Sequence, residues 1–355
     1  MSAARFPLEH PLHQVPGSIG PTATIISVEP QTILASKEFE PPEFSPRHDQ
    51  SMTRTDSPTV SVCIPAYNEE RNIGPLLRFL QTQGVQPGVL VEVLVDVSGS
   101  TDRTRDEVAE CQRRWSLVRM IDSGARDGLL FAVNRLIQTA RGDIVIRVDA
   151  DVRLDDRTLE QLVGALHAPD AGIASPRIVP GPSASTLVDR ASEAEWALHH
   201  RVSLAYPKTT LVQAFRRLPI TLPPESGLED AGLQEQITAL GYRAVYVPEA
   251  TVSVLPPPTV RGMMLQRIRT VQHIRDHLVR GYQAPSTAKF GTVWRAICSS
   301  IRNRDTTLRA LGTFAVIELL ARAAARASIL GLREPSFLWE PIEGTKEIDW
   351  TAAAR

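Results

Sequence analysis

The stretch that decides the fold of this chain is Gly142-Asp143-Ile144-Val145-Ile146-Arg147-Val148-Asp149-Ala150-Asp151. Its mostly apolar, β-branched run is typical of a buried central strand. Two carboxylates, Asp149 and Asp151, follow at the C-terminal end, where open α/β sheets bind their ligands. Because two acids held so close repel each other, a hard divalent cation that takes oxygen ligands is a natural partner for them. Acidic pairs are also common in ordinary loops, so this interpretation needs support from the rest of the chain.

The bulk composition is that of an ordinary globular protein. The chain has 355 residues, 43% of them hydrophobic and 22% charged, which fits one large or two modest domains. A net charge of -1 gives no overall field that would favour nucleic acid as a partner. Cys63, Cys111 and Cys298 are too widely spaced for a metal cluster or a disulfide framework, which favours a reducing compartment. Because no apolar signal segment is visible near residue 1, we expect a cytoplasmic protein.

The sequence pattern divides the chain into three regions. Residues 1–57 are rich in proline and irregular, which predicts a largely disordered extension. Residues 58–258 alternate strand and helix patterns, which predicts an α/β domain with a mostly parallel central sheet flanked by helices. Residues 259–355 show helical patterns only and form a helical C-terminal extension.

The periodicity also predicts individual elements. Strands are expected at residues 60–64, 90–95, 117–121, 143–148, 173–179, 211–215 and 244–254, the last as one or two strands. Helices are expected at residues 71–83, 102–115, 127–139 and 228–240. Asp102 is a plausible N-cap for the second of these helices.

The most apolar helical stretch, Leu308 to Leu332, has two possible interpretations. It is too interrupted to span a membrane, which takes about 18 apolar residues in a row. Glu318, Arg322 and Arg326 recur every fourth residue and therefore share one helix face. The stretch is either a surface helix packed on the domain or an amphipathic helix lying in a membrane interface.

Two further polar segments follow the first two predicted strands. After the first comes Pro65-Ala66-Tyr67-Asn68-Glu69-Glu70, whose backbone amides and Tyr67 ring could hold a flat base, although a plain turn before a helix would look similar. After the second comes Asp96-Val97-Ser98-Gly99-Ser100-Thr101-Asp102. Its hydroxyls and acids could contact a base or ribose, or could simply cap a helix.

Two more segments lie further along the chain. Glu229 and Asp230 open a predicted helix, where acids are commonly structural. A carboxylate placed opposite a sugar donor could instead deprotonate an acceptor hydroxyl. Gln266 and Arg269 are three residues apart and share a helix face. An arginine there could neutralise a leaving diphosphate, or belong to a solvated basic face.

Taken in order, these five segments resemble glycosyltransferase family 2. The resemblance covers Thr59 to Gln272 and includes Gly241-Tyr242-Arg243 and Val247-Pro248-Glu249-Ala250 after the Glu229-Asp230 pair. It implies the GT-A fold, which is the fold of nucleotide-diphospho-sugar transferases. It also implies a nucleotide-sugar donor, with a UDP-sugar expected, a Mg²⁺ or Mn²⁺ cofactor, and inversion at the anomeric carbon.

The resemblance implies a role for each matching residue. The nucleotide-binding turn is matched by Pro65, Ala66, Tyr67 and Glu69, and Ser98 stands where the family often has an aspartate that contacts the base. The acids that contact ribose and metal are matched by Asp149 and Asp151. The catalytic base is matched by Asp230, with Glu229 beside it, and the segment over the diphosphate by Gln266 and Arg269.

The chain also departs from the family pattern. Val97 and Ser98 replace a common acidic pair, which leaves the choice of base open, and Leu129 stands where many members have lysine. Thr270 follows Arg269, where processive members usually have tryptophan. Together with the absence of long apolar spans, this favours an enzyme that adds a single sugar.

Other functions remain open at this stage. A retaining transferase on the same fold would not need Asp230 as a base, and a catalytically inactive sugar-binding or membrane-recruiting subunit would tolerate the departures above. A sugar nucleotidyltransferase is disfavoured, because Pro65-Ala66-Tyr67-Asn68 stands where its glycine-rich phosphate loop would be.

The acceptor could be a glycan, a lipid-linked molecule or a small molecule. The stretch from Ala184 to Leu204 could line the acceptor side or be an ordinary amphipathic helix; its candidate lining residues are Glu193, Glu195, Trp196, His199 and His200. The many cations between Arg261 and Arg280 could meet anionic lipid on the inner face of a membrane, or be solvated.

Overall fold

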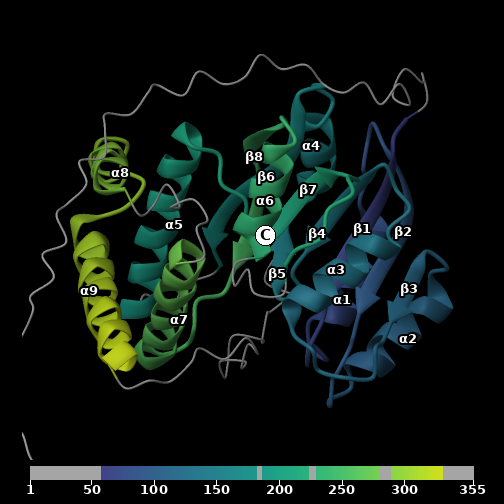
Figure 1. The fold of residues 1–355 in the computed structure, drawn as a ribbon, viewed down its shortest axis with the longest axis horizontal. Coiled ribbons are helices and arrows are strands. Elements are labelled where there is room, and N and C mark those ends of the chain that lie inside the picture. Colours follow the sequence, from purple (N-terminus) through teal and green to yellow (C-terminus); the bar gives the residue numbers. More distant parts are fainter. Residues whose placement is uncertain (1–56, 182–185, 224–228, 280–288, 331–355) are drawn as a thin grey trace, which may run out of the picture. The chain divides into compact units, whose positions relative to one another are not determined.

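The computed structural model describes residues 57–181, 186–223, 229–279 and 289–330. The predicted extension therefore lies outside the described residues apart from its last position, as do residues 331–355. Within the described part, strands and helices alternate from Thr59 onward, and the chain ends in three helices (Figure 1).

An eight-stranded mixed sheet forms the centre of the described structure, with the strand order β3-β2-β1-β4-β7-β6-β8-β5. The strands are β1 (Thr59–Pro65), β2 (Val89–Asp96), β3 (Val118–Ile121), β4 (Ile144–Val148), β5 (Val152–Leu154), β6 (Ala171–Pro180), β7 (Val212–Arg216) and β8 (Arg243–Val254). The pairs β1–β2, β1–β4, β2–β3 and β6–β8 are parallel, whereas β4–β7, β6–β7 and β5–β8 are antiparallel. The expected mostly parallel sheet is thus confirmed, with antiparallel pairing confined to its second half.

Nine helices are described around this sheet. They are α1 (Ile73–Thr82), α2 (Thr104–Arg114), α3 (Leu129–Thr139), α4 (Thr158–Ala165), α5 (Leu187–Ala205), α6 (Glu229–Ala239), α7 (Val260–Val279), α8 (Phe290–Arg302) and α9 (Leu308–Leu330). None of the described helices is long and apolar enough to cross a bilayer. The strand β5 and the helix α4 were not predicted, because three residues and eight residues are too short for a clear period.

Both faces of the sheet are buried, as the alternation along its strands requires. In β1, Val62 packs into one hydrophobic cluster and the next residue, Cys63, into another. In β4, Ile146 belongs to the first cluster and Val145 to the second. Because side chains alternate between faces, Arg147 lies on the same face of β4 as Val145, the face covered by α3 and α6.

The later helices form a group of their own at one end of the sheet. α5 contacts β6 and β8, while α8 packs on α5 and α9 packs on both α5 and α7 (Figure 1). A small core of Val188, Ala191, Met263 and Ile317 holds α5, α7 and α9 together. The C-terminal helices therefore pack on the domain through α5.

The predicted N-cap at Asp102 is wrong by one residue. Arg103 occupies the N-cap position of α2 and makes no side-chain cap hydrogen bond. Asp102 nevertheless accepts a hydrogen bond from the Thr104 amide at 3.0 Å, so an acid still satisfies an amide in the first turn.

We expect Gly142→Ala to destabilise the fold by about 1–3 kcal/mol, the usual cost of overpacking. A Cβ at this position would lie 2.5 Å from the Ser61 amide nitrogen and 2.8 Å from the Val60 carbonyl carbon, so it would push β1 and β4 apart. The matched control is Gly164→Ala in α4, where nothing lies within 4 Å and the variant should be slightly stabilised. Urea denaturation followed by circular dichroism measures both; equal stability of the two variants would contradict the clash.

Candidate active site

One cavity of about 1080 Å³ lies between the sheet and the helices α5, α7 and α9. Every residue that the family resemblance assigns to the nucleotide-sugar, metal or catalytic site lines it, although these residues come from five separate segments of the chain. The lining includes Pro65, Ala66, Tyr67, Glu69, Ser98, Asp149, Asp151, Glu229, Asp230, Gln266 and Arg269. The carboxyl end of β4 thus faces the start of α6 and the middle of α7 across a single space.

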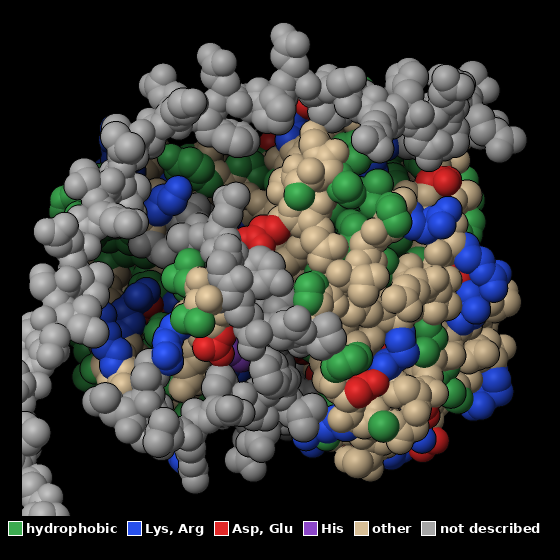
Figure 2. Space-filling view, in the orientation of Figure 1, with side chains coloured by type: hydrophobic (Ala, Val, Ile, Leu, Met, Phe, Trp, Pro, Cys, Tyr) green, Lys and Arg blue, Asp and Glu red, His purple; other side chains and the backbone are tan. Residues whose placement is uncertain are grey.

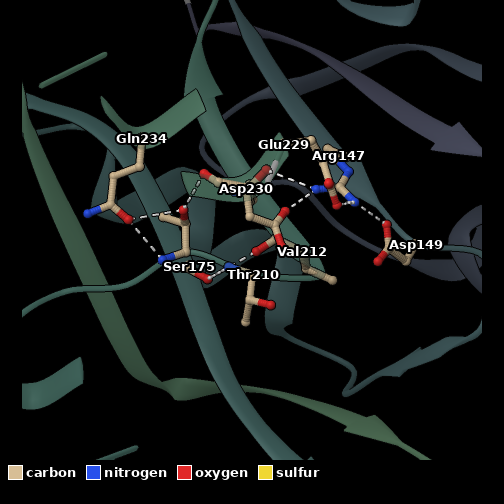
Figure 3. Close-up of polar contacts among 10 residues, drawn as sticks. Arg147, Asp149, Ser175, Thr210, Val212, Glu229, Asp230 and Gln234 are labelled. Atoms are coloured by element: carbon tan, nitrogen blue, oxygen red, sulfur yellow. Dashed lines mark hydrogen bonds and ion pairs between the residues drawn. The ribbon is translucent and has the colours of Figure 1, made fainter. Parts of the chain in front are cut away.

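At the centre of the site, one arginine holds three carboxylates. Arg147 is 2% exposed, and its Nη2 lies 2.6 Å from Asp149 Oδ1 and 3.4 Å from Glu229 Oε1. Its Nη1 donates to Asp230 Oδ1 (Figure 3). The same nitrogen donates to Gln213 Oε1 at 3.3 Å. Asp149 directly follows β4, whereas Glu229 and Asp230 lie in the first turn of α6, so Arg147 ties these two segments together.

Arg147 was missed in the sequence interpretation, which treated the strand as simply apolar. Two signals could have revealed it. A buried strand can hold a guanidinium only if counter-charges surround it, and the period of two puts Val145, Arg147 and Asp149 on one face. The partners from α6 are about eighty residues away in sequence and leave no such signal.

The electrostatics of this cluster are dominated by burial. Burial raises the pKa of Asp149 and of Glu229 above their ordinary values, and the neighbouring carboxylate of Asp230 adds to both shifts while Arg147 opposes them. For Arg147, burial alone would lower the pKa, but Asp149, Asp230 and Glu229 outweigh it, and the pKa is raised. The cluster has one cation for three acids, so it is short of positive charge.

That shortage fits a divalent cation at Asp149 and Asp151. Both side chains line the cavity and offer the carboxylate oxygens that Mg²⁺ and Mn²⁺ prefer. One oxygen of Asp149 accepts a hydrogen bond from Arg147 Nη2 at 2.6 Å. No group of three or more His, Cys, Asp and Glu that could hold a metal is found among the described residues.

Tyr67 presents its ring to the cavity beneath an arginine. The guanidinium carbon of Arg126 lies 4.3 Å from the ring centroid of Tyr67. Glu69 has a more local contact, since its carboxylate accepts a hydrogen bond from Asn72 Nδ2 at 2.9 Å and is buried at the start of α1. The first turn therefore offers a flat, cationic surface to a ligand, and Glu69 helps to hold its shape.

The second loop is held in place by buried polar contacts. Ser98 donates its amide to Asp96 Oδ1 at 3.0 Å, and its hydroxyl accepts from the Ser123 amide at 2.8 Å. Asp96 also lines the cavity and is paired with Arg135 at 2.8 Å. The acid at the end of β2 is therefore Asp96, and it is neutralised from α3.

Gln266 and Arg269 line the cavity from α7, and Arg267 beside them anchors this helix to α5 and α9. Arg267 Nη1 lies 2.5 Å from Glu195 of α5, and its Nε lies 2.8 Å from Glu318 of α9. Glu318 also pairs with Arg322 at 2.6 Å, so the charged face of α9 points toward α7 and the cavity. One side of α9 therefore packs on the domain.

Part of α5 also lines the cavity. The lining includes Glu195, Trp196 and His199, but neither Glu193 nor His200. His200 instead contacts the Tyr246 hydroxyl at 2.9 Å. Lys208, just after α5, lines the cavity too, and burial lowers its pKa to about 8, with Arg267 adding to the effect.

Several known proteins are similar to this chain. A structure of mannosyltransferase PcManGT from Pyrobaculum calidifontis, in complex with GDP-Man and Mn²⁺, matches with a TM-score of 0.50 and 25% identity, over 78% of this chain and 84% of that one. An N-acetylglucosaminyltransferase of Bradyrhizobium diazoefficiens is 25% identical over 241 residues, and one of Sinorhizobium fredii is 24% identical over 263 residues. These matches cover 60% and 66% of this chain but only 48% and 62% of the two relatives.

The fold and the family model both indicate a glycosyltransferase domain. The strands, helices and C-terminal extension described above agree with the GT-A fold of the solved neighbours, which confirms the expected fold class. The family model described as "Glycosyl transferase family 2" matches residues 61–225, which run from β1 to beyond β7. Residues 61–225 are therefore a glycosyl transferase family 2 domain.

Proposed function

We propose that this protein transfers one sugar from a nucleoside-diphosphate sugar, with a UDP-sugar as the first candidate, to an acceptor hydroxyl. The single observation that carries this proposal is the cavity that unites Asp149 and Asp151 with Asp230 and Arg269. Acids suited to a cation–diphosphate pair lie on one side, and a carboxylate suited to proton transfer lies on another. A transferase needs both in one space.

Asp230 is the residue best placed to accept the acceptor's proton. Arg147 holds its Oδ1, and among the described residues no hydrogen bond is formed by its second oxygen. The side chain is 23% exposed and lines the cavity, so a hydroxyl can reach it. Arg147 is a positioning residue in this scheme, because it fixes Asp230 relative to Asp149 without reaching the substrate.

The donor would lie along the edge of the sheet. Tyr67 and Ser98 lie where they could meet the base, and Asp149 where it could meet the ribose. Arg269, from α7, would offset the negative charge that develops on the leaving diphosphate. A Mg²⁺ or Mn²⁺ ion held by Asp151 would supply Lewis-acid stabilisation of the two phosphates. Displacement in line with the departing diphosphate would invert the anomeric carbon, and NMR of the product anomer distinguishes this outcome from retention.

The similar proteins support a nucleotide sugar as the donor, but they do not restrict the acceptor to one class of molecule. Two of them are named N-acetylglucosaminyltransferases, and the solved mannosyltransferase holds GDP-Man with Mn²⁺. A dolichol-phosphate mannosyltransferase of Pyrococcus furiosus is 32% identical over 107 residues, 30% of each chain. We propose a hexose or N-acetylhexosamine as the transferred sugar, and a cytoplasmic site of action at the inner face of a membrane.

A ligand screen tests the proposal directly. Nucleoside-diphosphate sugars with uracil and guanine bases are added to the full chain with and without Mn²⁺, and the melting temperature is recorded. A bound donor stabilises the folded state by mass action, so one base should raise the melting temperature only when metal is present. No shift with any donor, and no release of nucleoside diphosphate on prolonged incubation, would overturn the proposal.

We expect Asp151→Ala to abolish the metal dependence of donor binding. The loss of one ligand leaves the cation without its main protein contact, so the affinity for nucleoside diphosphate should fall by about tenfold or more in Mn²⁺. Asp156→Ala is the control, since Asp156 is exposed and carries the same charge five residues further on. Calorimetric titration measures both variants; unchanged affinity in Asp151→Ala would remove this acid from the metal site.

A further inference from the structure

The helix α8 faces solvent with its apolar side. Phe290 is 82% exposed and Trp294 is 56% exposed, and their rings stack with centroids 6.4 Å apart at an angle of 13°. Ile301 lies on the same side and is 41% exposed, whereas Ala296 and Ser300 are buried. An amphipathic helix that belonged only to a soluble core would bury the large apolar residues and expose the small ones.

The helix α9 repeats this arrangement. Leu308, Val316, Leu319 and Leu320 are between 55% and 71% exposed, although Ile317 and three alanines of the same helix are buried. Large apolar side chains scattered singly over a surface need no explanation, but two consecutive helices that both turn such residues outward mark an interaction surface.

Positive charge surrounds these apolar residues. Residues 260–279 and 289–327 contain eleven Lys and Arg against three Asp and Glu, a net charge of +8, in a chain whose total is -1. Among the described residues, no ion pair is formed by the exposed side chains of Arg295, Arg302, Arg304 and Arg309. Figure 2 shows Lys and Arg side chains interspersed with hydrophobic ones over the part of the surface where α7, α8 and α9 lie. Helices that lie in a membrane interface typically combine basic side chains with exposed apolar and aromatic ones, as α8 and α9 do.

The same surface continues into the cavity. Phe290 and Leu278, which are 82% and 40% exposed, are also lining residues, as are Arg275, Arg322 and Arg326. An apolar path with basic side chains therefore leads from the outside of α8 toward Asp230.

We propose that the outer faces of α8 and α9 dock on a bilayer that contains anionic phospholipid. The apolar side chains enter the interface and the arginines contact lipid phosphates. The helices lie along the surface, since none of those described is suited to span it. This docking brings the mouth of the cavity to the lipid and does not depend on the proposed transfer.

Vesicle sedimentation with the full chain tests the proposal. We expect co-sedimentation with vesicles of phosphatidylcholine and phosphatidylglycerol, weaker binding to phosphatidylcholine alone, and release by added salt. The double variant Phe290→Ser with Trp294→Ser should lower the partition coefficient by about tenfold or more. Met120→Ser, at a 38% exposed position on β3, is the apolar control and should bind as the original chain does.

A second pair of variants tests the charge. Arg302→Gln with Arg309→Gln should lower binding to the anionic vesicles by about tenfold or more and flatten the salt dependence. Arg113→Gln with Arg114→Gln, at exposed positions on α2, should not. The proposal is overturned if the original chain stays in the supernatant with both kinds of vesicle. It is also overturned if the Phe290 and Trp294 variant binds lipid normally but dissociates a dimer seen by light scattering, because the apolar surface would then belong to a second copy. The absence of sugar transfer would leave these outcomes unchanged.

Discussion

Asp230→Asn is expected to slow sugar transfer by about a hundredfold to ten-thousandfold, the range that general acid–base catalysis contributes. The amide keeps the size of the side chain and can still meet Arg147 through its oxygen, but it cannot take a proton. Donor binding should be nearly unchanged, because Asp149, Asp151 and Arg269 are intact. Initial rates at saturating donor, together with calorimetric titration of nucleoside diphosphate and Mn²⁺, separate the two effects.

The control for this variant lies on the same helix. Glu235→Gln removes an acid five residues further along α6, where it contacts His277 at 3.0 Å, and should change the rate only a few-fold. If Asp230→Asn turns over at the original rate, the base is a different group. Glu229→Gln then becomes the next variant to test, since Glu229 is 9% exposed beside it and also lines the cavity.

Arg147→Met is expected to destabilise the protein by about 3–5 kcal/mol, the usual cost of removing one partner from a buried ion pair. The methionine fills most of the space but leaves three carboxylates without their common cation. Arg147→Lys should recover part of the loss, because an ammonium keeps the charge but lacks the planar fork that reaches Asp149 and Asp230 through separate nitrogens. Urea denaturation measures the free energy of unfolding of each variant.

An exposed ion pair provides the control. Arg243 on β8 pairs with Asp170, and the two side chains are 52% and 43% exposed, so Arg243→Met should cost at most about 1 kcal/mol. If Arg147→Met were no more costly than Arg243→Met, Arg147 would not be the residue that holds β4 to α6.

The pH dependence of stability gives a second measure of the same cluster. Since burial raises the pKa of Asp149 and of Glu229, from 3.8 and 4.5 respectively to about 7, the folded state keeps protons that the unfolded chain has released. The resulting stabilisation is present below their ordinary values and is lost as pH rises toward 7. Without the opposing charge of Arg147 the loss should be steeper, so the difference between Arg147→Met and the original chain should grow with pH.

Much of the first half of the fold could be predicted because its information is local. The strands β1, β2 and β4 are continuous apolar runs bounded by polar turns, and the structure places them within one or two residues of the expected positions. The candidate site residues could be found for a related reason: in a parallel sheet, the loops after neighbouring strands meet at one edge. The residues that come from α6 and α7 were placed only by the family resemblance.

The contacts that organise the site could not be predicted, because they join distant parts of the chain. Nothing in the local pattern of β4 shows that Arg147 will meet Glu229 and Asp230, or that Arg126 will lie over Tyr67. The exposure of Phe290 and Trp294 was also missed, since periodicity shows that a helix is amphipathic but not which side faces the protein.

The division of the cavity between two parts of the chain has a consequence for how its specificity can change. The acids at the end of β4 and the turn after β1 lie in the segment shared with the family, residues 61–225, whereas the far wall is built by α7, α8 and α9. Substitutions in those helices can reshape what enters from that side while the edge of the sheet stays as it is. These helices can therefore diverge in evolution, or be exchanged in a chimera, while the sheet edge is kept. Arg267 connects α7 to α5 through Glu195 and to α9 through Glu318, so any such exchange must preserve these two ion pairs.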